Sequence, residues 1–364
     1  MLPRQRPPDW ATTCKIPKST EGRTTMSELD YYEYNYTNDT DYLPDYELDT
    51  SVSYPVEVLS MVLYSITFVL GVPGNGIVIW ITGLKMKRTV NTTWFLNLAI
   101  ADFICCLSLP FSVVNIALNY HWPYGNALCK VIPSAIVLNM FASVFILTLV
   151  SVDRCTLVTK PVWSQNNRTV WLANLLCGTV WLLALIMCLP TLIYREIWLE
   201  NNITICNYGD HEDTVGIERV LHSTRLIFGF FIPFITITTC YSLITLKVRR
   251  SQFSKSSKTL KIILAVIVSF FICWIPYHVI GVLHSFAAPM SDLANTVQIL
   301  DPLVICLAYI NSCLNPLLYV FMGQDFKDKI RTSLRNILES AFSEDVTRST
   351  LHSKARSSRD ETAT

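Results

Sequence analysis

Charged residues are scarce in this chain of 364 residues: Asp, Glu, Lys and Arg make up 16% of it, whereas hydrophobic residues make up 51%. A soluble protein would carry about 25% charged residues. The deficit excludes an ordinary water-soluble domain and indicates a chain that lies mostly in membrane lipid. The net charge of +1 adds little, because acidic and basic residues are separated along the chain.

Signatures of catalysis and metal binding are also missing. The sequence has no nucleophile with an adjacent base and no paired aspartates, and its histidines lack metal-ligand spacing. Most of the 12 cysteines lie inside apolar runs, where they are typical of small buried hydrophobes. There is no internal repeat of the kind that transporters show. We therefore expect no enzyme, no structural metal, no cofactor and no nucleic-acid partner; a transporter or channel is the less favoured alternative.

Long apolar runs are what the chain has instead. A membrane-spanning helix needs about 20 predominantly apolar residues. Seven runs meet this requirement, near residues 57–84, 92–120, 130–152, 171–194, 221–246, 260–286 and 298–322. The sequence predicts an all-α membrane protein, a bundle of seven transmembrane helices over residues 56–322.

The basic residues predict the orientation of this bundle. They gather in alternate gaps between the runs, for example at Lys87 and Arg88, at Lys160 and Arg168, and at Arg249 and Arg250. Cytoplasmic loops are enriched in Lys and Arg. We expect a multi-pass protein of the plasma membrane with its amino terminus outside and its carboxyl terminus inside.

The segments outside the bundle differ from it in composition. Residues 1–25 are polar and do not resemble a signal peptide. Residues 28–49 hold six tyrosines and eight carboxylates without one Lys or Arg, which predicts a disordered extracellular tail over 1–55. Residues 323–342 alternate cationic and apolar positions at helical spacing and predict an amphipathic helix on the inner membrane surface. Residues 343–364 are Ser/Thr-rich and predicted to be disordered.

Five Asn-X-Ser/Thr triplets match the glycosylation pattern. Those at Asn35, Asn38 and Asn202 fall on the predicted outer side, so we expect them to be acceptors. Those at Asn91 and Asn167 fall on the cytoplasmic side and are rejected.

One carboxylate, Asp102, lies in the middle of a predicted span. Ionisable residues in spans usually face a bundle interior or a cavity. With Asn139, Ser143, Asn311 and Asn315 from other spans it could line an oxygen-rich pocket for a sodium ion. A protonated Asp in a hydrogen-bond network is an equally good interpretation.

Seven ordered landmarks give a specific resemblance. GVPGNGIVIW, LAIAD, DRC (Asp153–Cys155), Trp181, Pro233 with Tyr241, CWIPY and NPLLY occur one in each successive run. Over residues 57–330 the chain resembles the rhodopsin-like G-protein-coupled receptors, although DRC departs from the more usual Asp-Arg-Tyr.

The resemblance implies a ligand-switched bundle and a heterotrimeric G protein as its partner. Trp274 and Pro276 would form the pivot of the sixth helix, and Arg154, beside Asp153, would act with Tyr241 and Tyr319 as cytoplasmic switches. Cys129 would pair with a cysteine of the second outer loop, where Cys206 is the candidate.

Three charges near the outer ends of the helices indicate the ligand. Arg195 closes the fourth run, Arg225 lies about two helical turns outward of Pro233, and Asp301 about four turns outward of Pro316. Arginine suits carboxylates, and Asp301 would suit a cation. Arg195 could instead be an interfacial side chain that reaches for water. The set favours a ligand that bears a carboxylate and a positive group together, such as a peptide that ends in arginine.

A closer resemblance agrees with this ligand. LGVPGNGIVIW, MKRTVNTTWFLNLAIADFICCLSLPFS, HWPYGNALCKVIPSAIVLNMFASVFILT and NILESAFSEDVTRST are similar to complement anaphylatoxin receptors, chiefly the component-3a type. Anaphylatoxins end in arginine, and Tyr277 and Trp274 would lie beneath the terminal-arginine contacts. The second outer loop is much shorter here than the component-3a type usually has, so a component-5a type and a lineage that never expanded this loop remain open. Formyl-peptide and chemokine receptors are less similar.

The family also implies modifications, coupling and partners. Tyrosines beside acidic residues, at Tyr31, Tyr32, Tyr34, Tyr42 and Tyr46, are candidates for sulfation and for capture of a basic ligand. The phosphorylation candidates for receptor kinases, which would recruit arrestin, are Ser343, Thr347, Ser349, Thr350, Ser353, Ser357 and Ser358. We expect chemotactic and inflammatory signalling through an inhibitory-type G protein.

Overall fold

The computed structural model describes residues 50–200, 202–208, 214–250, 258–288, 291–322, 328 and 331–332. Several predictions lie outside the described residues. They are the acidic tail with its tyrosines, Asn35 and Asn38, the phosphorylation candidates at 343–358 and the side chain of Tyr319. Of the amphipathic segment expected at 323–342, Asp328, Arg331 and Thr332 are described; all three are helical, and Thr332 Oγ1 donates to the Asp328 carbonyl at 2.9 Å. That segment stays a prediction.

The first half of the described chain is a series of helices. α1 (Thr50–Trp80) ends in a short π-helical segment, η1 (Ile81–Lys85), and is followed by α2 (Val90–Leu107), α3 (Leu109–Ala117), α4 (Gly125–Thr159), α5 (Pro161–Asn167) and α6 (Val170–Tyr194). Thr89 caps α2 reciprocally with Thr92, which fixes the start of that helix.

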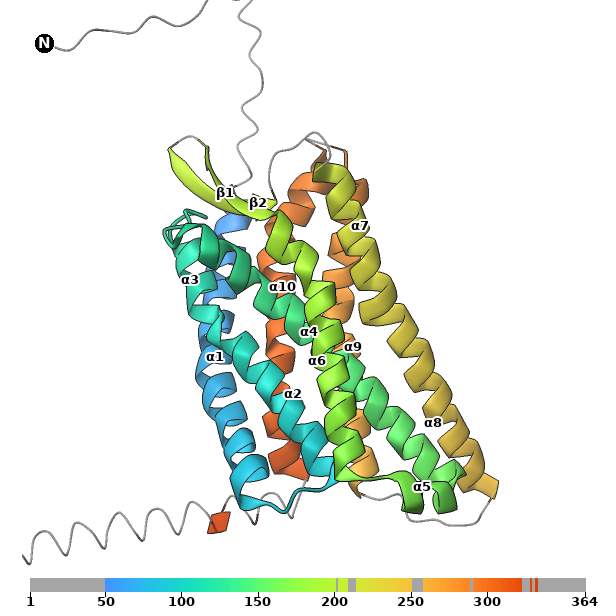
Figure 1. Ribbon diagram of the computed structural model, residues 1–364. Coiled ribbons are helices and arrows are strands. Elements are labelled where there is room, and N and C mark those ends of the chain that lie inside the picture. The colour runs from blue at the N-terminus through green and yellow to red at the C-terminus, as the bar shows by residue number, and fades with distance from the viewer. Residues whose placement is uncertain are drawn as a thin grey trace, which may run out of the picture. The chain divides into compact units, whose positions relative to one another are not determined.

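The second half begins with a β-hairpin and returns to helices. The strands are β1 (Arg195–Glu200) and β2 (Ile203–Tyr208); the later elements are α7 (Thr214–Leu226), η2 (Ile227–Phe231), α8 (Ile232–Arg250), α9 (Lys258–Phe286) and α10 (Asp292–Met322). Figure 1 shows the helices side by side, with β1 and β2 at one end and α5 at the other. These two ends are called the hairpin end and the α5 end below.

Among the described residues, seven segments are long and apolar enough to cross a membrane: Val52–Lys85, Val90–Ala117, Gly125–Thr159, Val170–Tyr194, Gly216–Val248, Ile263–Phe286 and Asp292–Leu318. They overlap the seven runs of the sequence, and the predicted bundle is confirmed. Most helices extend past the predicted bounds, because capping and polar residues continue a helix beyond the apolar stretch that marks it.

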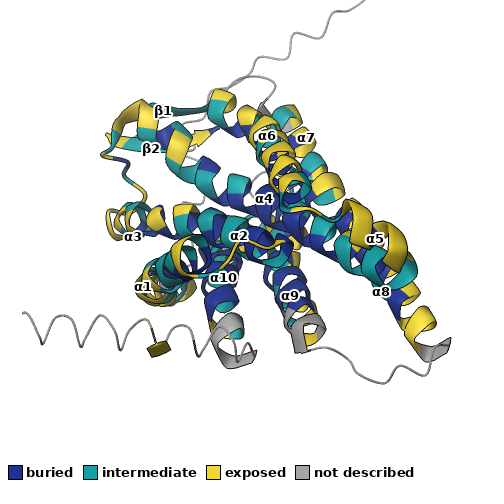
Figure 2. Cartoon of the chain, turned by 60° about the horizontal axis from the view of Figure 1, so that its bottom comes forward, coloured by how far each residue is buried: buried dark blue, intermediate teal, exposed yellow. Residues whose placement is uncertain are grey.

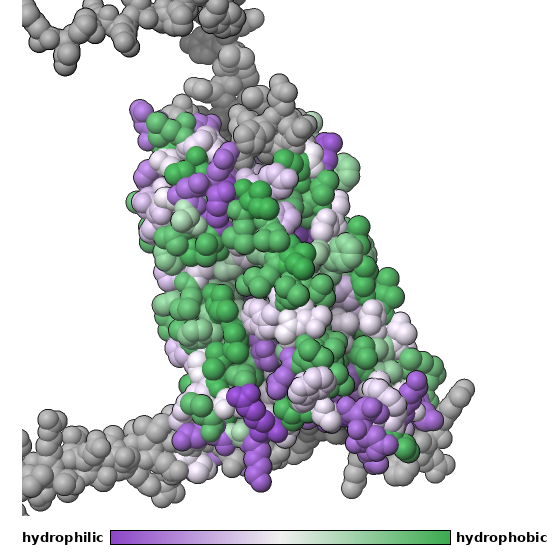
Figure 3. Space-filling model, viewed as in Figure 1, coloured by the Kyte–Doolittle hydropathy of each residue, from purple (hydrophilic) through white to green (hydrophobic). Residues whose placement is uncertain are grey.

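The surface agrees with a membrane-embedded bundle. Figure 3 shows hydrophobic side chains over the middle of the visible face and hydrophilic ones gathered toward its two ends. Among the described residues, many large apolar side chains are exposed, such as Trp171 (72%) and Phe286 (76%). In water such a surface would cause association; in lipid it faces a solvent as apolar as itself.

The core lies around α4, which packs against α2, α6 and α8. Figure 2 shows the buried faces of the helices turned inward around α4 and the exposed faces turned outward. Trp274, Phe141 and Phe270 are among the largest fully buried side chains. Gly71 allows α1 to lie close to α2, since a Cβ there would overlap the Cys106 sulfur.

The fifth span contains a π-helical turn that positions the residues before it. At η2 the N–H of Ile232 donates to the carbonyl of Ile227, five residues earlier. The next residue, Pro233, has no N–H to continue an α-helical pattern. Single π turns of this kind are frequent at functional sites, and Arg225 lies directly before this one.

The hairpin is tied to the bundle at several points. Strands β1 and β2 are antiparallel, with Arg195 opposite Tyr208. A disulfide joins Cys206 of β2 to Cys129 of α4, as the resemblance implied. The backbone of Thr204 accepts from the Trp122 N–H (2.7 Å) and donates to His121 Nδ1 (3.1 Å). Asn202, exposed at the turn between the strands, has a positive φ of 63°.

Candidate ligand-binding site and switch

Arg225, in the last turn of α7, is a buried cation at the hairpin end. Its side chain is 6% exposed. Nη1 donates to the Tyr277 hydroxyl (3.1 Å), and Nη2 donates to Thr191 Oγ1 (2.9 Å) and to the Tyr208 hydroxyl (2.8 Å). Arg225 therefore joins α7 to α9, to the end of α6 and to β2.

All these partners of Arg225 are neutral hydroxyls. Within the described residues no carboxylate lies at ion-pair distance from its guanidinium. Burying a charge without a counterion costs free energy, and hydroxyl dipoles offset that cost only in part. Burial alone would raise the pKa of the Tyr208 phenol, but the charges of Arg225 and Arg195 hold this pKa below its usual value. The site attracts negative charge.

Arg195 is the second cation at this end. It is half-buried at the start of β1, and its guanidinium carbon lies 4.9 Å from the centre of the Tyr208 ring. Nη1 makes a long contact of 3.4 Å with the Cys206 carbonyl, and Nε has no hydrogen-bond partner among the described residues. The structure thus places both predicted arginines against one tyrosine, Tyr208.

Asp301, on α10, is exposed and belongs to the same region. The described residues offer it neither a hydrogen bond nor an ion pair within 4 Å. Its charge nonetheless interacts through space with His284 and then Arg195, and with the Tyr277 hydroxyl, which Arg225 also contacts. The hairpin end therefore brings together Arg195, Arg225 and the carboxylate of Asp301, which has no ion pair within 4 Å among the described residues.

Aromatic contacts lead from this group into the core. The ring of Tyr277 packs edge-on against Trp274, with 5.4 Å between centroids, and Trp274 lies 5.8 Å from Phe270. Pro276 lies inside α9, between Trp274 and Tyr277. Tyr277 therefore contacts both Arg225 and Trp274, so a change in the hydrogen bonds of Arg225 can alter the packing of Trp274 through Tyr277 alone.

The candidate sodium pocket is partly assembled. Asp102 is fully buried and accepts from Asn139 Nδ2 (2.9 Å) and Asn315 Nδ2 (2.7 Å). Ser143 and Asn311 are also buried, but within the described part of the chain their side chains make no hydrogen bond. The amide oxygens of Asn139 and Asn315 are likewise unpartnered there. These orphaned oxygens suit a hard cation such as sodium.

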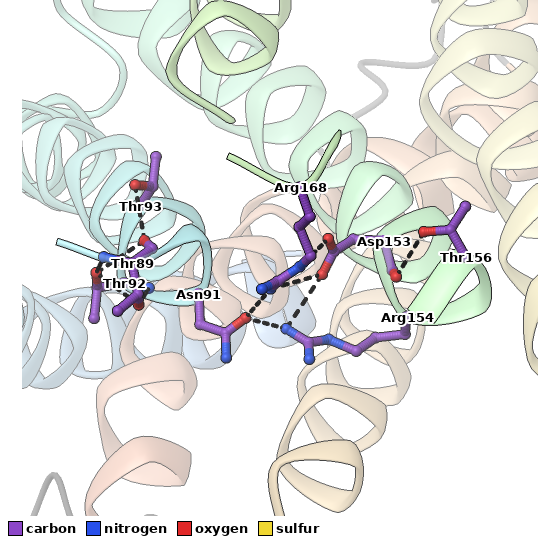
Figure 4. Close-up of polar contacts among 8 residues, drawn as sticks. All are labelled: Thr89, Asn91, Thr92, Thr93, Asp153, Arg154, Thr156 and Arg168. Carbon is purple, nitrogen blue, oxygen red and sulfur yellow. Dashed lines mark hydrogen bonds and ion pairs between the residues drawn. The ribbon is translucent and has the colours of Figure 1, made fainter. Parts of the chain in front are cut away.

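At the α5 end, Asp153 and Arg154 form an ion pair of 3.3 Å (Figure 4). Asp153 also binds Arg168, which follows α5, and both arginines donate to Asn91 Oδ1 of α2. The Tyr241 hydroxyl on α8 is buried and has no partner among the described residues.

Sequence reasoning missed four of these contact residues. Tyr208 and Thr191, which hold Arg225, are ordinary polar residues far from it in the chain, and no spacing pattern points to them. Arg168 was interpreted as a cytoplasmic charge, and Asn91 as a rejected glycosylation triplet. The amide oxygen of Asn91 accepts from both arginines.

Comparison with known proteins identifies the family. The family model described as 7 transmembrane receptor (rhodopsin family) matches residues 74–319. The chain belongs to this family. It is a multi-pass G-protein-coupled receptor and not an enzyme, which confirms the predicted fold and class.

Individual relatives are similar over most of the receptor. The C3a anaphylatoxin chemotactic receptor of Oncorhynchus mykiss is 56% identical over 307 residues, which cover 82% of this receptor and 84% of that protein. The human receptor of the same name is 34% identical over 446 residues (81% and 92%). The C5a anaphylatoxin chemotactic receptor 1 of Oryctolagus cuniculus is 41% identical over 323 residues (88% and 92%).

These relatives differ in the length over which they align. The human alignment is longer than the 364 residues of this receptor, so the human protein contains residues without a counterpart here. The Oncorhynchus mykiss alignment, at 307 residues, shows no such excess. A chain of this length is therefore compatible with the name that both proteins carry.

Proposed function

We propose that this receptor binds a complement anaphylatoxin of the component-3a type, whose carboxyl-terminal arginine enters the hairpin end of the bundle. The observation that carries the proposal is the burial of Arg225 with neutral partners. A terminal carboxylate supplies the missing counterion and accepts a bidentate hydrogen bond from the guanidinium. The names of the similar receptors support the same ligand class.

The other charges of the site bind the two charged groups of the ligand's terminal arginine, its guanidinium and its carboxylate. Asp301, open to a cation, binds the ligand's guanidinium, while Arg195, stacked on Tyr208, adds to the positive field around the carboxylate. Tyr277 and Trp274 form the floor of the site. The carboxylate draws Arg225 from the Tyr277 hydroxyl, and the freed tyrosine repacks against Trp274, next to Pro276 inside α9.

A component-5a ligand is the alternative, supported by the 41% identity with the Oryctolagus cuniculus receptor. The two ligands share a terminal arginine, so the site alone does not separate them. Calcium flux and cyclic AMP in cells that express the receptor, tested with both fragments with and without that arginine, decide between them. If removal of the arginine changed no response, the roles of Arg225 and Asp301 would be wrong.

The acidic tail is proposed to capture the ligand first. Carboxylates, and sulfates on Tyr31, Tyr32, Tyr34, Tyr42 and Tyr46, give a negative segment that steers a basic ligand toward the bundle. High salt then weakens binding of the whole anaphylatoxin more than binding of its short carboxyl-terminal peptide. Equal weakening of both would refute the capture step.

Signalling is proposed to run through an inhibitory-type G protein at the α5 end, which is the cytoplasmic end. Arg154, released from Asp153, reaches the G protein with Tyr241 and Tyr319 nearby. Phosphorylation by receptor kinases at 343–358 then recruits arrestin, while residues 323–342 lie on membrane lipid. The exposed turn at Asn202 suits an extracellular, glycosylated hairpin end. A fall in cyclic AMP on ligand addition tests the coupling and excludes a transporter.

Asp102 is proposed to hold an allosteric sodium ion with Asn139, Ser143, Asn311 and Asn315. The unpartnered amide oxygens of Asn139 and Asn315, whose nitrogens bind the carboxylate, support this assignment. The ion would neutralise the carboxylate inside the bundle and favour the arrangement of helices that surrounds it.

A further inference from the structure

Asp153 at the α5 end is shared by two arginines that hold it unequally. Arg168 makes two hydrogen bonds to the carboxylate, from Nε to Oδ1 at 2.7 Å and from Nη2 to Oδ2 at 3.2 Å. This is the two-pronged geometry in which arginine binds carboxylates best. Arg154 reaches the same carboxylate with one atom, Nη2, at 3.3 Å from Oδ2. Figure 4 shows both guanidinium groups turned toward Asp153.

The hydrogen bond of Arg154 goes to a neutral group instead. Its Nη2 donates to the amide oxygen of Asn91, which also accepts from Arg168 Nη2 at 2.7 Å. The Nε of Arg154 is buried and has no partner among the described residues. Arg154 therefore has one contact with the carboxylate and one neutral acceptor, whereas Arg168 has two hydrogen bonds to the carboxylate.

The charge of Arg168 acts in the same direction. It opposes the charge of Arg154 through space, and it uses the carboxylate oxygens that Arg154 would need for a two-pronged pair. All three charged side chains are mostly shielded, with 10% to 24% of the side-chain surface exposed, so water screens these interactions little.

We propose that Arg168 is a positioning residue of the switch: it occupies Asp153 and so keeps Arg154 ready for release to the G protein. Without Arg168, both oxygens of Asp153 turn to Arg154 and the repulsion between the arginines disappears. The latch between Asp153 and Arg154 tightens, and the receptor activates less readily. The inference rests on the G-protein coupling proposed above.

The test uses the full-length receptor in membranes with a purified inhibitory heterotrimeric G protein, and measures ligand-independent nucleotide exchange at matched receptor amount. Arg168→Gln should lower this exchange roughly three- to tenfold, the range expected for strengthening one partly buried ion pair. Arg168→Lys keeps the charge but loses the two-pronged geometry, so its exchange should lie in between.

Two further variants separate this role from a structural one. Lys160→Gln removes a positive charge at the exposed end of α4, outside the cluster, and should leave exchange unchanged. Combining Arg168→Gln with Asp153→Asn removes the acceptor that would trap Arg154, so exchange should recover. A misfolded receptor would not recover.

Three results would overturn the proposal. The first is that nucleotide exchange in Arg168→Gln is unchanged or higher. The second is that Lys160→Gln lowers exchange as much as Arg168→Gln does. The third is that exchange does not recover when Arg168→Gln is combined with Asp153→Asn. Absence of exchange in every form, the unaltered receptor included, would overturn the coupling itself and this inference with it. If only the positioning role of Arg168 were wrong, the unaltered receptor would still stimulate nucleotide exchange, so the two failures can be told apart.

Discussion

Arg225 and Arg154 are both shielded arginines, one at each end of the same bundle, but their partners differ. Arg225 donates to the hydroxyls of Tyr277, Thr191 and Tyr208, without a carboxylate among the described residues. Arg154 lies 3.3 Å from the carboxylate of Asp153. Among the described residues, Arg225 has no counterion, and Arg154 shares its counterion with Arg168.

The difference agrees with the roles proposed for the two arginines. A binding site for an anion must keep its cation unpaired, because an internal carboxylate would compete with the ligand. A switch needs an internal partner that holds the arginine until another protein takes it. In the proposed function, the ligand supplies the missing counterion at the hairpin end, whereas at the α5 end the internal ion pair has to open.

Replacing the uncompensated cation should have the largest effect. Arg225→Gln removes the carboxylate's partner, and truncating one member of a buried charged pair costs about 2–5 kcal/mol, or roughly 30-fold or more in potency. Cyclic AMP dose–response curves with an arginine-ended peptide measure it. Arg219→Gln, on the same helix but exposed, is the matched control and should change potency little. Equal losses in both variants would remove Arg225 from the site.

Asp301→Asn should come next. This carboxylate is exposed, so its pairing with the ligand's guanidinium is worth about 1 kcal/mol and potency should fall roughly fivefold. A peptide without the terminal arginine should respond equally in both receptors. If that peptide lost as much potency as the arginine-ended one, Asp301 would not contact the arginine.

Asp102→Asn tests the middle of the bundle, between the two ends. In the unaltered receptor, replacing sodium by a bulky organic cation at equal ionic strength should change agonist affinity roughly fivefold, at the low end of typical coupling free energies. The variant should show no such change. A persistent sodium effect in Asp102→Asn would place the ion elsewhere.

Tyr208→Phe should have the smallest effect on signalling. It removes one neutral acceptor of Arg225, which the ligand's carboxylate replaces, so potency should change less than about threefold. The free receptor, however, should lose roughly 1 kcal/mol of stability, detected as a lower thermal unfolding midpoint in detergent. Tyr194→Phe, at an exposed position, should show neither change. A large loss of potency would make Tyr208 a ligand contact in its own right.

Much of this architecture was predictable from the sequence, because a helix that crosses lipid needs a long run of apolar residues, and such runs are easy to find. Runs of apolar residues predicted the seven spans, and charges in otherwise apolar outer segments pointed to Arg225 and Asp301. The span ends were less accurate: the third was expected at 130–152 and extends over Gly125–Thr159. Polar residues continue that helix, and hydropathy does not detect them.

The contacts around these charges were not predictable. Thr191 lies 34 positions from Arg225 along the chain, and Tyr277 lies 52 positions from it, so only the packing of helices brings them together. Hydroxyl side chains also carry no pattern that separates a guanidinium partner from an ordinary core residue. For the same reason the sequence indicated only a cytoplasmic charge at Arg168, and its hydrogen bond to Asp153 is known from the fold alone.

The most direct test of the central claim, that Arg225 is a buried cation completed by the ligand's carboxylate, is a double-mutant cycle. Binding of the arginine-ended peptide and of its carboxyl-terminal amide is measured on the unaltered receptor and on Arg225→Gln. Amidation should weaken binding to the unaltered receptor by roughly tenfold or more and binding to Arg225→Gln very little, which gives a coupling free energy above about 1.4 kcal/mol. If amidation weakened binding to both receptors equally, the carboxylate would bind elsewhere and the account of this site would be contradicted.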